Sequence, residues 1–471
     1  MKSSFTISEH LDKNKVFIVN SSEIDNRLDP SWCVYLNSVK NFKYEKVLLK
    51  NLLLKNPQYG ANEIGVDRKS YDDPRYIRIT DINEFGELNR DIGKTADKIE
   101  EKYFLEDGDL LLARSGNTVG KSYLHTDTGY KCFFAGYMIR FKIDTSKTLP
   151  DYVFVFTQTR IYKNWVAAIQ RTTGQPNINA EEYRNLAIPL PSFEIQRKLI
   201  SIYYEALKQK QENESEAEKL LASIDDYFLD ELGIKLPTQP ENSLKNRTFY
   251  TSLKEISGGR FDPFFYQNKF TNNIGEIKKS KYPVMPLKHI INNNLVKGIL
   301  PRHEEKEGSN KVVQINSINV DGTINLDDLL TAKDIFSNNH LLRKNDVLVV
   351  ITGATIGKVA YWIERDENYF LGGDIVKFQT IEPVDSAYIY YFLRSYPIQT
   401  QIKRDITGAT NGHLSPEDIK HLPIPLPPLP KQQEIANHIT QIRNQAQLLK
   451  EQANIAIKQA NQEIEQILIG S

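Results

Sequence analysis

Two long segments of the chain, about 194–232 and about 431–468, contain no proline and no internal glycine. In the second segment the apolar residues return every three or four positions, close to the heptad spacing of a packed helix. These positions are Ile435, Ile439, Ile442, Ala446, Leu449, Ala453, Ala456, Ala460 and Ile464. The pattern predicts a helix of about 37 residues, roughly 55 Å long. Its many alanines predict close packing against another helix.

The first long segment carries the same spacing about 236 residues earlier. The corresponding positions are Leu199, Tyr203, Ala206, Lys210, Asn213, Ala217, Leu220, Ile224 and Phe228. This seam is apolar at both ends and polar in the middle, at Lys210 and Asn213. One interpretation is two separate surface helices of a single core. Pseudo-two-fold symmetry favours the other interpretation, an antiparallel pair of coiled-coil-like helices.

The two helices are part of a duplication that runs through the whole chain. Short motifs of the first half return in the second half, in the same order and about 236 residues later. The matching pairs are Arg27-Leu28-Asp29-Pro30 with Arg260-Phe261-Asp262-Pro263, Lys43-Tyr44 with Lys281-Tyr282, Ile79-Thr80-Asp81-Ile82-Asn83 with Ile315-Asn316-Ser317-Ile318-Asn319, Gly116-Asn117-Thr118-Val119-Gly120-Lys121 with Gly353-Ala354-Thr355-Ile356-Gly357-Lys358, and Leu186-Ala187-Ile188-Pro189-Leu190-Pro191 with Leu422-Pro423-Ile424-Pro425-Leu426-Pro427. The chain therefore consists of two copies of one unit, each of roughly 235 residues.

Each copy has the same predicted plan. Short β-rich runs, such as 137–141 and 347–351, are separated by turn residues. A loop rich in Thr, Gly and Asn then leads into a short helix, which begins after Asn179 in one copy and after Ser415 in the other. Glu182 and Asp418, three residues further on, make the first start a capping box and the second a variant of it. A segment with proline at every second residue follows, which we expect to be a stiff extended connector.

These patterns predict an α+β fold: two pseudo-two-fold-related β-rich domains separated by two long antiparallel coiled-coil-like helices. We place the first β-rich domain at 1–192 and the central long helix at 193–235. The second β-rich domain then covers 236–429, and the C-terminal long helix covers 430–471.

Composition limits the class of protein further. Apolar residues make up 40% and charged residues 25% of the chain, enough for a core in each half. The two cysteines, Cys33 and Cys132, exclude a disulfide framework and a cysteine-rich zinc site. No apolar run suggests a signal peptide or a membrane span, so we expect a soluble, cytoplasmic protein. Since 60 basic residues balance 60 acidic ones, any contact with nucleic acid must come from local patches.

The glycine-lysine motif at 116–122 resembles a phosphate-binding P-loop without matching it. A P-loop needs four residues between its glycines, whereas three stand between Gly116 and Gly120. Ser115 occupies the place of the first glycine, and Val359 in the second copy replaces the magnesium-binding Ser or Thr. We predict a tight turn after a strand, which can also offer Lys121 and Lys358 to a phosphate group.

The motifs and their duplicated order resemble the specificity subunit of type I restriction-modification systems. The resemblance is carried by the Gly-x-Thr-[Val/Ile]-Gly-Lys turns, the Arg-[Leu/Phe]-Asp-Pro segments, the Thr-Gly-rich loops and the Ile-Pro-Leu-Pro segments before each long helix, and it covers essentially the whole chain. In that family each β-rich unit is a target-recognition domain that reads one half of a split DNA sequence. The resemblance further implies that the paired helices fix the spacer and dock methyltransferase subunits. An endonuclease subunit that also translocates DNA completes such a complex.

The resemblance makes the loops and turns candidate contacts to double-stranded DNA. Gln175, Asn177 and Asn411 can bond adenine bidentately, with Thr173, Thr410 and His413 beside them. Arg171 and Arg404 precede the loops and can meet phosphate or guanine. Arg114, Thr118 and Thr355 belong to the same set because they lie in or next to the glycine turns. The alternative is that Asn and Thr only satisfy the backbone of a turn.

The apolar seam of the long helices supplies the candidate partner-binding residues. These are Leu199, Tyr203, Leu220, Ile224, Ile435, Ile439, Ile442 and Leu449. We expect modification subunits to dock on these helices, as the resemblance implies.

We expect no catalytic residue, no metal site and no cofactor. The chain shows no methyltransferase signature, and its eight histidines have no metal-ligand spacing. The predicted function is therefore a non-catalytic DNA-recognition subunit. Two alternatives stay open: a scaffold whose helices organise partners without sequence-specific DNA binding, and a P-loop enzyme.

Overall fold

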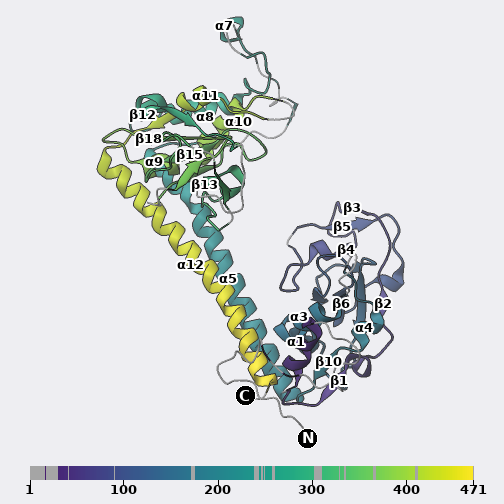
Figure 1. Cartoon of the computed structure of the whole chain (residues 1–471). Helices are drawn as coiled ribbons and strands as arrows, with labels where there is room; N and C mark the ends of the chain where they lie inside the picture. Colours follow the sequence, from purple (N-terminus) through teal and green to yellow (C-terminus); the bar gives the residue numbers. More distant parts are fainter. Residues whose placement is uncertain are drawn as a thin grey trace. The chain divides into compact units, whose positions relative to one another are not determined.

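Contacts within the chain divide it into two units. The computed structural model covers 471 residues and describes residues 16, 18, 30–40, 42–89, 91–170, 176–237, 243, 244, 248, 250–256, 260–301, 310–327, 329–333, 336–363, 368–408 and 412–469. Unit 1 consists of Met1–Glu214 with Lys450–Ser471, and unit 2 consists of Ser215–Leu449. The C-terminal stretch of the chain thus completes the unit that contains the N-terminus (Figure 1).

Unit 1 is built on two small sheets. The first has the order β2 (Gln58–Tyr59), β9 (Met138–Lys142), β6 (Asp109–Ala113) and β7 (Ser122–Leu124), and all its pairs are antiparallel. The second has the order β3 (Gly65–Asp67), β5 (Lys94–Ala96), β4 (Arg75–Ile77) and β8 (Cys132–Phe134), with β4 and β8 parallel. Short 3-10 helices follow or precede strands at Leu49–Leu52, Ile79–Asp81 and Glu101–Tyr103.

Strand β6 explains how two cores form on either side of one sheet. Successive side chains of a strand point to opposite faces, and all of β6 is buried. Leu110 and Leu112 belong to the core that includes the helices, whereas Leu111 belongs to the core shared with the second sheet. The first core is covered by α1 (Pro30–Val39), α2 (Pro150–Gln158), α3 (Arg160–Ile169) and α4 (Ala180–Arg184), with α1 and α3 side by side (Figure 1).

Unit 2 repeats this plan. Its larger sheet has the order β12 (Ile291–Lys297), β18 (Ile375–Thr380), β15 (Val347–Val350) and β16 (Val359–Tyr361), and its smaller sheet joins β14 (Leu330–Ala332), β13 (Asn310–Val313) and β17 (Tyr369–Leu371). The helices are α7 (Leu253–Ile256), α8 (Asn268–Lys278), α9 (Ser386–Arg394), α10 (Tyr396–Asp405) and α11 (Pro416–Lys420), with 3-10 turns at Leu287–His289 and Ile315–Ser317. Val347 and Val349 pack on the helical side and Leu348 and Val350 on the other, the same alternation as in β6.

The proline-alternating segments are strands, not isolated connectors. β10 (Ala187–Pro189) pairs with β1 (Lys46–Leu48), and β19 (Pro423–Pro425) pairs with β11 (Val284–Pro286). Each is an antiparallel pair of two strands. Proline is tolerated because the non-proline residues beside it donate, as in Leu190 N to Glu45 O at 2.8 Å. The predicted extended conformation is correct, but the sequence did not predict that these segments pair with other strands.

The short helices begin where the sequence predicts. In α4 the Asn179 side chain accepts from Glu182 N (2.9 Å) and the Glu182 carboxylate accepts from Asn179 N (2.7 Å), a complete capping box. In α11 the Ser415 hydroxyl accepts from Glu417 N (3.2 Å) in place of the third position. The variant expected at Ser415 is therefore a single-bond cap.

The long helices are α5 (Phe193–Leu232) and α12 (Leu429–Leu468), within two residues of the predicted starts. Each has one half in unit 1 and the other half in unit 2. In unit 2, Lys431 pairs with Glu231 (2.8 Å), and the ring of Tyr227 lies 4.3 Å from that of His438. Since the residue number rises along one helix as it falls along the other, the helices are antiparallel, as predicted.

The polar position Lys210 in the α5 seam has a structural reason. Lys210 is buried, pairs with Glu214 (2.7 Å) and lies over the Phe85 ring (4.4 Å). Tyr203 donates its hydroxyl to Phe85 O (3.2 Å), and Gln211 donates to the Glu87 carboxylate. The middle of the seam therefore holds a loop of unit 1 against the helix.

Among the described residues, no helix is long and apolar enough to cross a membrane.

Candidate nucleic-acid interface

Each glycine-lysine motif forms a tight hairpin turn. In unit 1 the turn joins β6 to β7, with Gly116 and Gly120 at φ values of 80° and 86°. Gly120 N donates to Ala113 O (2.9 Å), and a Cβ at Gly120 would lie 2.6 Å from the Val166 side chain. Only glycine fits both the backbone conformation and this close approach.

The hairpin geometry speaks against a nucleotide site. A P-loop leads from a strand into a helix, whereas both of these turns lead from one antiparallel strand to the next. In the part of the chain that the structure describes, no group of three or more His, Cys, Asp or Glu residues could hold a metal ion.

The lysine of each motif clamps the hairpin to a neighbouring loop. Lys121 Nζ donates to Ile82 O (2.7 Å), and Lys358 Nζ donates to Ile318 O (2.9 Å). Burial lowers the pKa of Lys121, and the nearby Glu84 carboxylate opposes this shift. In each unit one hydrogen bond therefore joins the glycine-lysine motif to the repeated motif about 40 residues earlier, at 79–83 or 315–319. The predicted phosphate contact of the lysines stays a prediction.

In each unit the Thr-Gly-rich loop ends against the glycine-lysine hairpin of that unit. In unit 1, Gly116 N donates to Pro176 O (3.0 Å) and Ile178 N to Arg114 O (2.8 Å), with Ser115 and Asn177 bridged. In unit 2, Leu414 N donates to Ile351 O (2.9 Å), and Thr352 and His413 are bridged. The side chains of Thr352 and His413 lie 3.3 Å apart, from Oγ1 to Nδ1. We call this meeting point of hairpin and loop the junction.

Some of the predicted DNA contacts lie at or beside the junctions. Arg114 and the exposed Asn177 lie at the junction of unit 1, and Thr118 lies in the hairpin turn next to it. His413 lies at the junction of unit 2 and Thr355 lies in the turn of its hairpin, and both are half-buried. Arg171, Thr173, Gln175, Thr410 and Asn411 lie outside the described residues.

Arg404 has partners within the chain, and its predicted contact with DNA stays a prediction. Its Nε donates to the Asp405 carboxylate (2.8 Å), and its guanidinium lies 4.4 Å from the Phe265 ring. Arg260, from the Arg-Phe-Asp-Pro motif, lies 5.0 Å from the same ring and donates to Asp405 O (3.1 Å) and Ile406 O (3.1 Å). Burial raises the pKa of Asp405, and Arg404 opposes that shift. This motif anchors the segment that precedes the loop.

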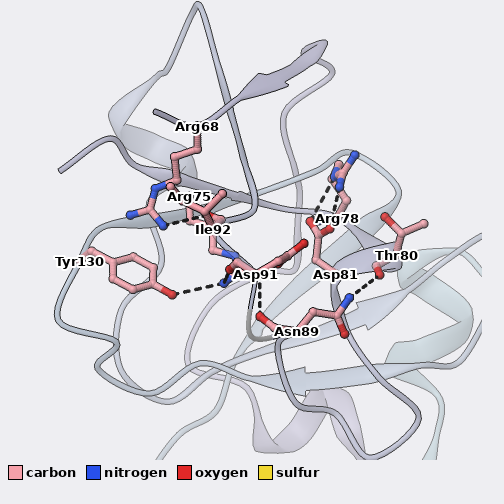
Figure 2. Close-up of polar contacts among 9 residues, drawn as sticks. All are labelled: Arg68, Arg75, Arg78, Thr80, Asp81, Asn89, Asp91, Ile92 and Tyr130. Atoms are coloured by element: carbon pink, nitrogen blue, oxygen red, sulfur yellow. Dashed lines mark hydrogen bonds and ion pairs between the residues drawn. The ribbon is translucent and has the colours of Figure 1, made fainter. Parts of the chain in front are cut away.

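Two buried arginines of unit 1 carry a role that the sequence did not reveal. Arg75 donates to Asn89 O (3.0 Å), to the Asp91 carboxylate (2.9 Å) and to the Tyr130 hydroxyl (3.3 Å) (Figure 2). Arg68 donates to Ile92 O (3.2 Å) and lies over the Tyr130 ring at 4.3 Å. These bonds fix the loop after the 3-10 helix at 79–81. Carbonyl acceptors leave no sequence pattern, so the residues could not be identified in advance.

A buried ion pair lies at equivalent positions of the sheet that contains β6 in unit 1 and the sheet that contains β15 in unit 2. In unit 1, Arg140 pairs with Asp109 (3.2 Å) and also donates to the Gln58 side chain. In unit 2, Lys377 pairs with Asp346 (2.8 Å). The shorter lysine adjoins a polar pocket lined by Asn292, Val296, Asn338, Asn339, Arg343, Asp346, Lys377, Phe378 and Gln379.

The predicted partner-binding residues of the helices divide into two groups. Leu199 and Tyr203 are buried in the core of unit 1, and Ile435 and Ile439 in that of unit 2. These four pack the chain itself, so they offer no surface to another protein. The half-buried members are Leu220, Ile224, Ile442 and Leu449. Docking of a partner on the helices stays a prediction, and it must use positions other than the enclosed four.

The duplicated mixed fold and the long helices define a protein of two repeated units. The chain matches the type I restriction modification DNA specificity domain twice, over residues 34–221 and 242–459. It therefore belongs to the family of type I restriction-modification specificity proteins. This membership confirms the predicted non-catalytic DNA-recognition subunit and places the chain in a multisubunit, DNA-directed system.

Individual relatives are distant in sequence. The type I restriction enzyme MjaVIII specificity subunit of Methanocaldococcus jannaschii is 19% identical over 352 residues, covering 73% of this chain and 74% of that protein. The type I restriction enzyme EcoBI specificity subunit of Escherichia coli is 26% identical over 165 residues, 33% of this chain and 34% of that protein. A chain from a solved structure that concerns complex assembly and conformational transition of the type I R-M system has a TM-score of 0.53 at 15% identity, covering 92% of this chain and 99% of that chain. It supports the fold class predicted from the sequence.

Proposed function

We propose that each unit reads one half of a bipartite DNA target through its junction. The supporting observation is that one equivalent backbone bond and one equivalent bridge build the junction in both units while its side chains differ. A common scaffold with different side chains is what two readers of different half-sites require. In this proposal the recognition domains are 1–192 and 236–429.

The long helices set the distance between the two readers. A helix of 40 residues is about 60 Å long, enough for two domains to reach major-groove segments about one turn of DNA apart. Modification subunits dock on exposed helix positions and methylate the DNA, and an endonuclease-translocase subunit joins through the complex. We expect this complex in the cytoplasm, where the chain meets DNA.

Methylation of a randomised DNA library tests the proposal. The chain, purified with the modification subunit of its own system, should direct methylation to one split sequence. Its affinity for that DNA should fall steeply as salt rises, because phosphate contacts release counterions. Binding of the modification subunit without any sequence preference would instead identify a scaffold.

A second variant tests the helices as a ruler. Deleting seven residues from the middle of each helix keeps the heptad register and shortens each by about 10 Å. The preferred spacer should shorten by about three base pairs, at 3.4 Å per pair, while both half-sites stay the same. A seven-residue deletion from α5 alone is the control, because it breaks the match between the two helices. An unchanged spacer in the double deletion would contradict the ruler role.

A further inference from the structure

One position of the junction has the same backbone and a different side chain in the two units. Arg114 N donates to Tyr137 O (2.9 Å), and Arg114 O accepts from Ile178 N (2.8 Å). Ile351 makes the equivalent bonds, to Asp374 O (2.9 Å) and from Leu414 N (2.9 Å). The two residues therefore stand at one structural position, where unit 1 presents a cation and unit 2 a fully buried aliphatic side chain.

The guanidinium of Arg114 lacks acceptors. Its Nε is enclosed and has no hydrogen-bond partner, and within the described residues the contact recorded for the guanidinium is the Tyr59 ring at 4.9 Å. Arg68, Arg75 and Arg140 of the same unit each donate to carbonyl or carboxylate groups, although Nε of Arg75 is also enclosed without a partner. An arginine has five N–H donors, and leaving one of them, the enclosed Nε–H, unmet is costly. Arg114 is therefore prepared for an acceptor from outside the chain.

The surroundings of Arg114 fit a planar ligand edge. The Tyr59 hydroxyl accepts from Ala180 N (3.2 Å), which fixes the ring on which the guanidinium lies. Stacking on an aromatic face orients the plane of a guanidinium and leaves its edge free to donate. Tyr137 (63% exposed) and the exposed Asn177 border the same junction.

We propose that Arg114 is a specificity-determining residue that reads a guanine in the half-site recognised by unit 1. The guanidinium fork donates to O6 and N7 of guanine, the commonest base-specific contact of arginine. Unit 2, with Ile351 at this position, reads no guanine here. The inference rests on the proposed function, since it assumes that the junction faces the bases.

The test uses the chain together with its modification subunit and a randomised DNA library whose methylated sites are sequenced. Arg114→Lys keeps the charge and loses the bidentate fork, and Arg114→Ile installs the residue of unit 2. Both should relax one guanine of one half-site by roughly 5- to 150-fold and leave the other half-site unchanged. Lys147→Ala is the control, because this exposed lysine lies beyond the opposite end of β9 and pairs with Asp144.

Each other outcome overturns the inference. A uniform loss over all sequences, with a salt slope smaller by about one, would make Arg114 a phosphate contact. An unchanged motif together with a lower melting temperature would make it a support for Tyr59. A wild-type motif without guanine in one half-site would also contradict it. If the wild-type complex methylates no split motif, the proposed function itself fails, which separates the two.

Discussion

The buried pair Asp346–Lys377 joins the residue just before β15 to β18 and offers a sharp test of what stabilises the larger sheet of unit 2. The side chains are 3% and 8% exposed, respectively, and Lys377 Nζ lies 2.8 Å from the Asp346 carboxylate. The same carboxylate also accepts from Arg343 N at 2.8 Å. The substitution Lys377→Met removes the cation and leaves the carboxylate enclosed with one donor fewer.

The expected cost is large because a single enclosed charge remains. Breaking a buried pair on one side costs about 3–5 kcal/mol, which corresponds to a hundred- to several-thousand-fold change in an opening equilibrium, roughly. Lys377→Arg should cost about 1 kcal/mol or less. Unit 1 carries Arg140 at this position, and the polar pocket beside Lys377 has room and acceptors for a guanidinium.

Native-state hydrogen exchange measures this strand by strand, which suits a chain of two units. Amides of β15 and β18 should exchange much faster in Lys377→Met and nearly unchanged in Lys377→Arg. Amides of β6 and β9 in unit 1 are the internal reference. Equal exchange in both variants would show that the ion pair contributes little and would refute the reasoning.

Three further predictions address the junction and the helix contacts. Gly120→Ala should lower the melting temperature far more than Gly129→Ala, since both glycines have positive φ but only the first Cβ would meet another side chain; equal shifts would contradict this. Lys121→Met leaves Ile82 O without its donor and should cost about 1–2 kcal/mol, seen as faster exchange of β6 and β7 amides; unchanged exchange would show that the clamp is not stabilising. Burial raises the pKa of Glu465 above its ordinary 4.5, so its stabilising contribution is present below that value and lost as the pH rises through the raised pKa. Glu465→Gln should therefore flatten the stability profile just above pH 4.5, measured by thermal unfolding; a profile that keeps its slope would contradict this.

Local patterns were enough to predict the duplication, the long helices, the capping box at Asn179 and the hairpin glycines. These features depend on residues close together in sequence, whose spacing is set by the period of a helix or the φ angle of a turn. The repeated order of motifs then supported the family and the function. The sequence predicted that the proline segments are extended. Their pairing with β1 and β11 became visible only in the structure.

The remaining features depend on contacts between residues far apart in the chain. The hydrogen bond from Lys121 to Ile82 and the contact of the Arg114 guanidinium with the Tyr59 ring exist because the fold brings separate segments together. A lysine or arginine has the same helix and strand propensities whether it reaches a carbonyl, a carboxylate or no acceptor at all. The sequence by itself therefore determined the turns and the loop ends that form the junction. Only the tertiary structure decided that these segments meet and which of their polar groups are satisfied within the described residues.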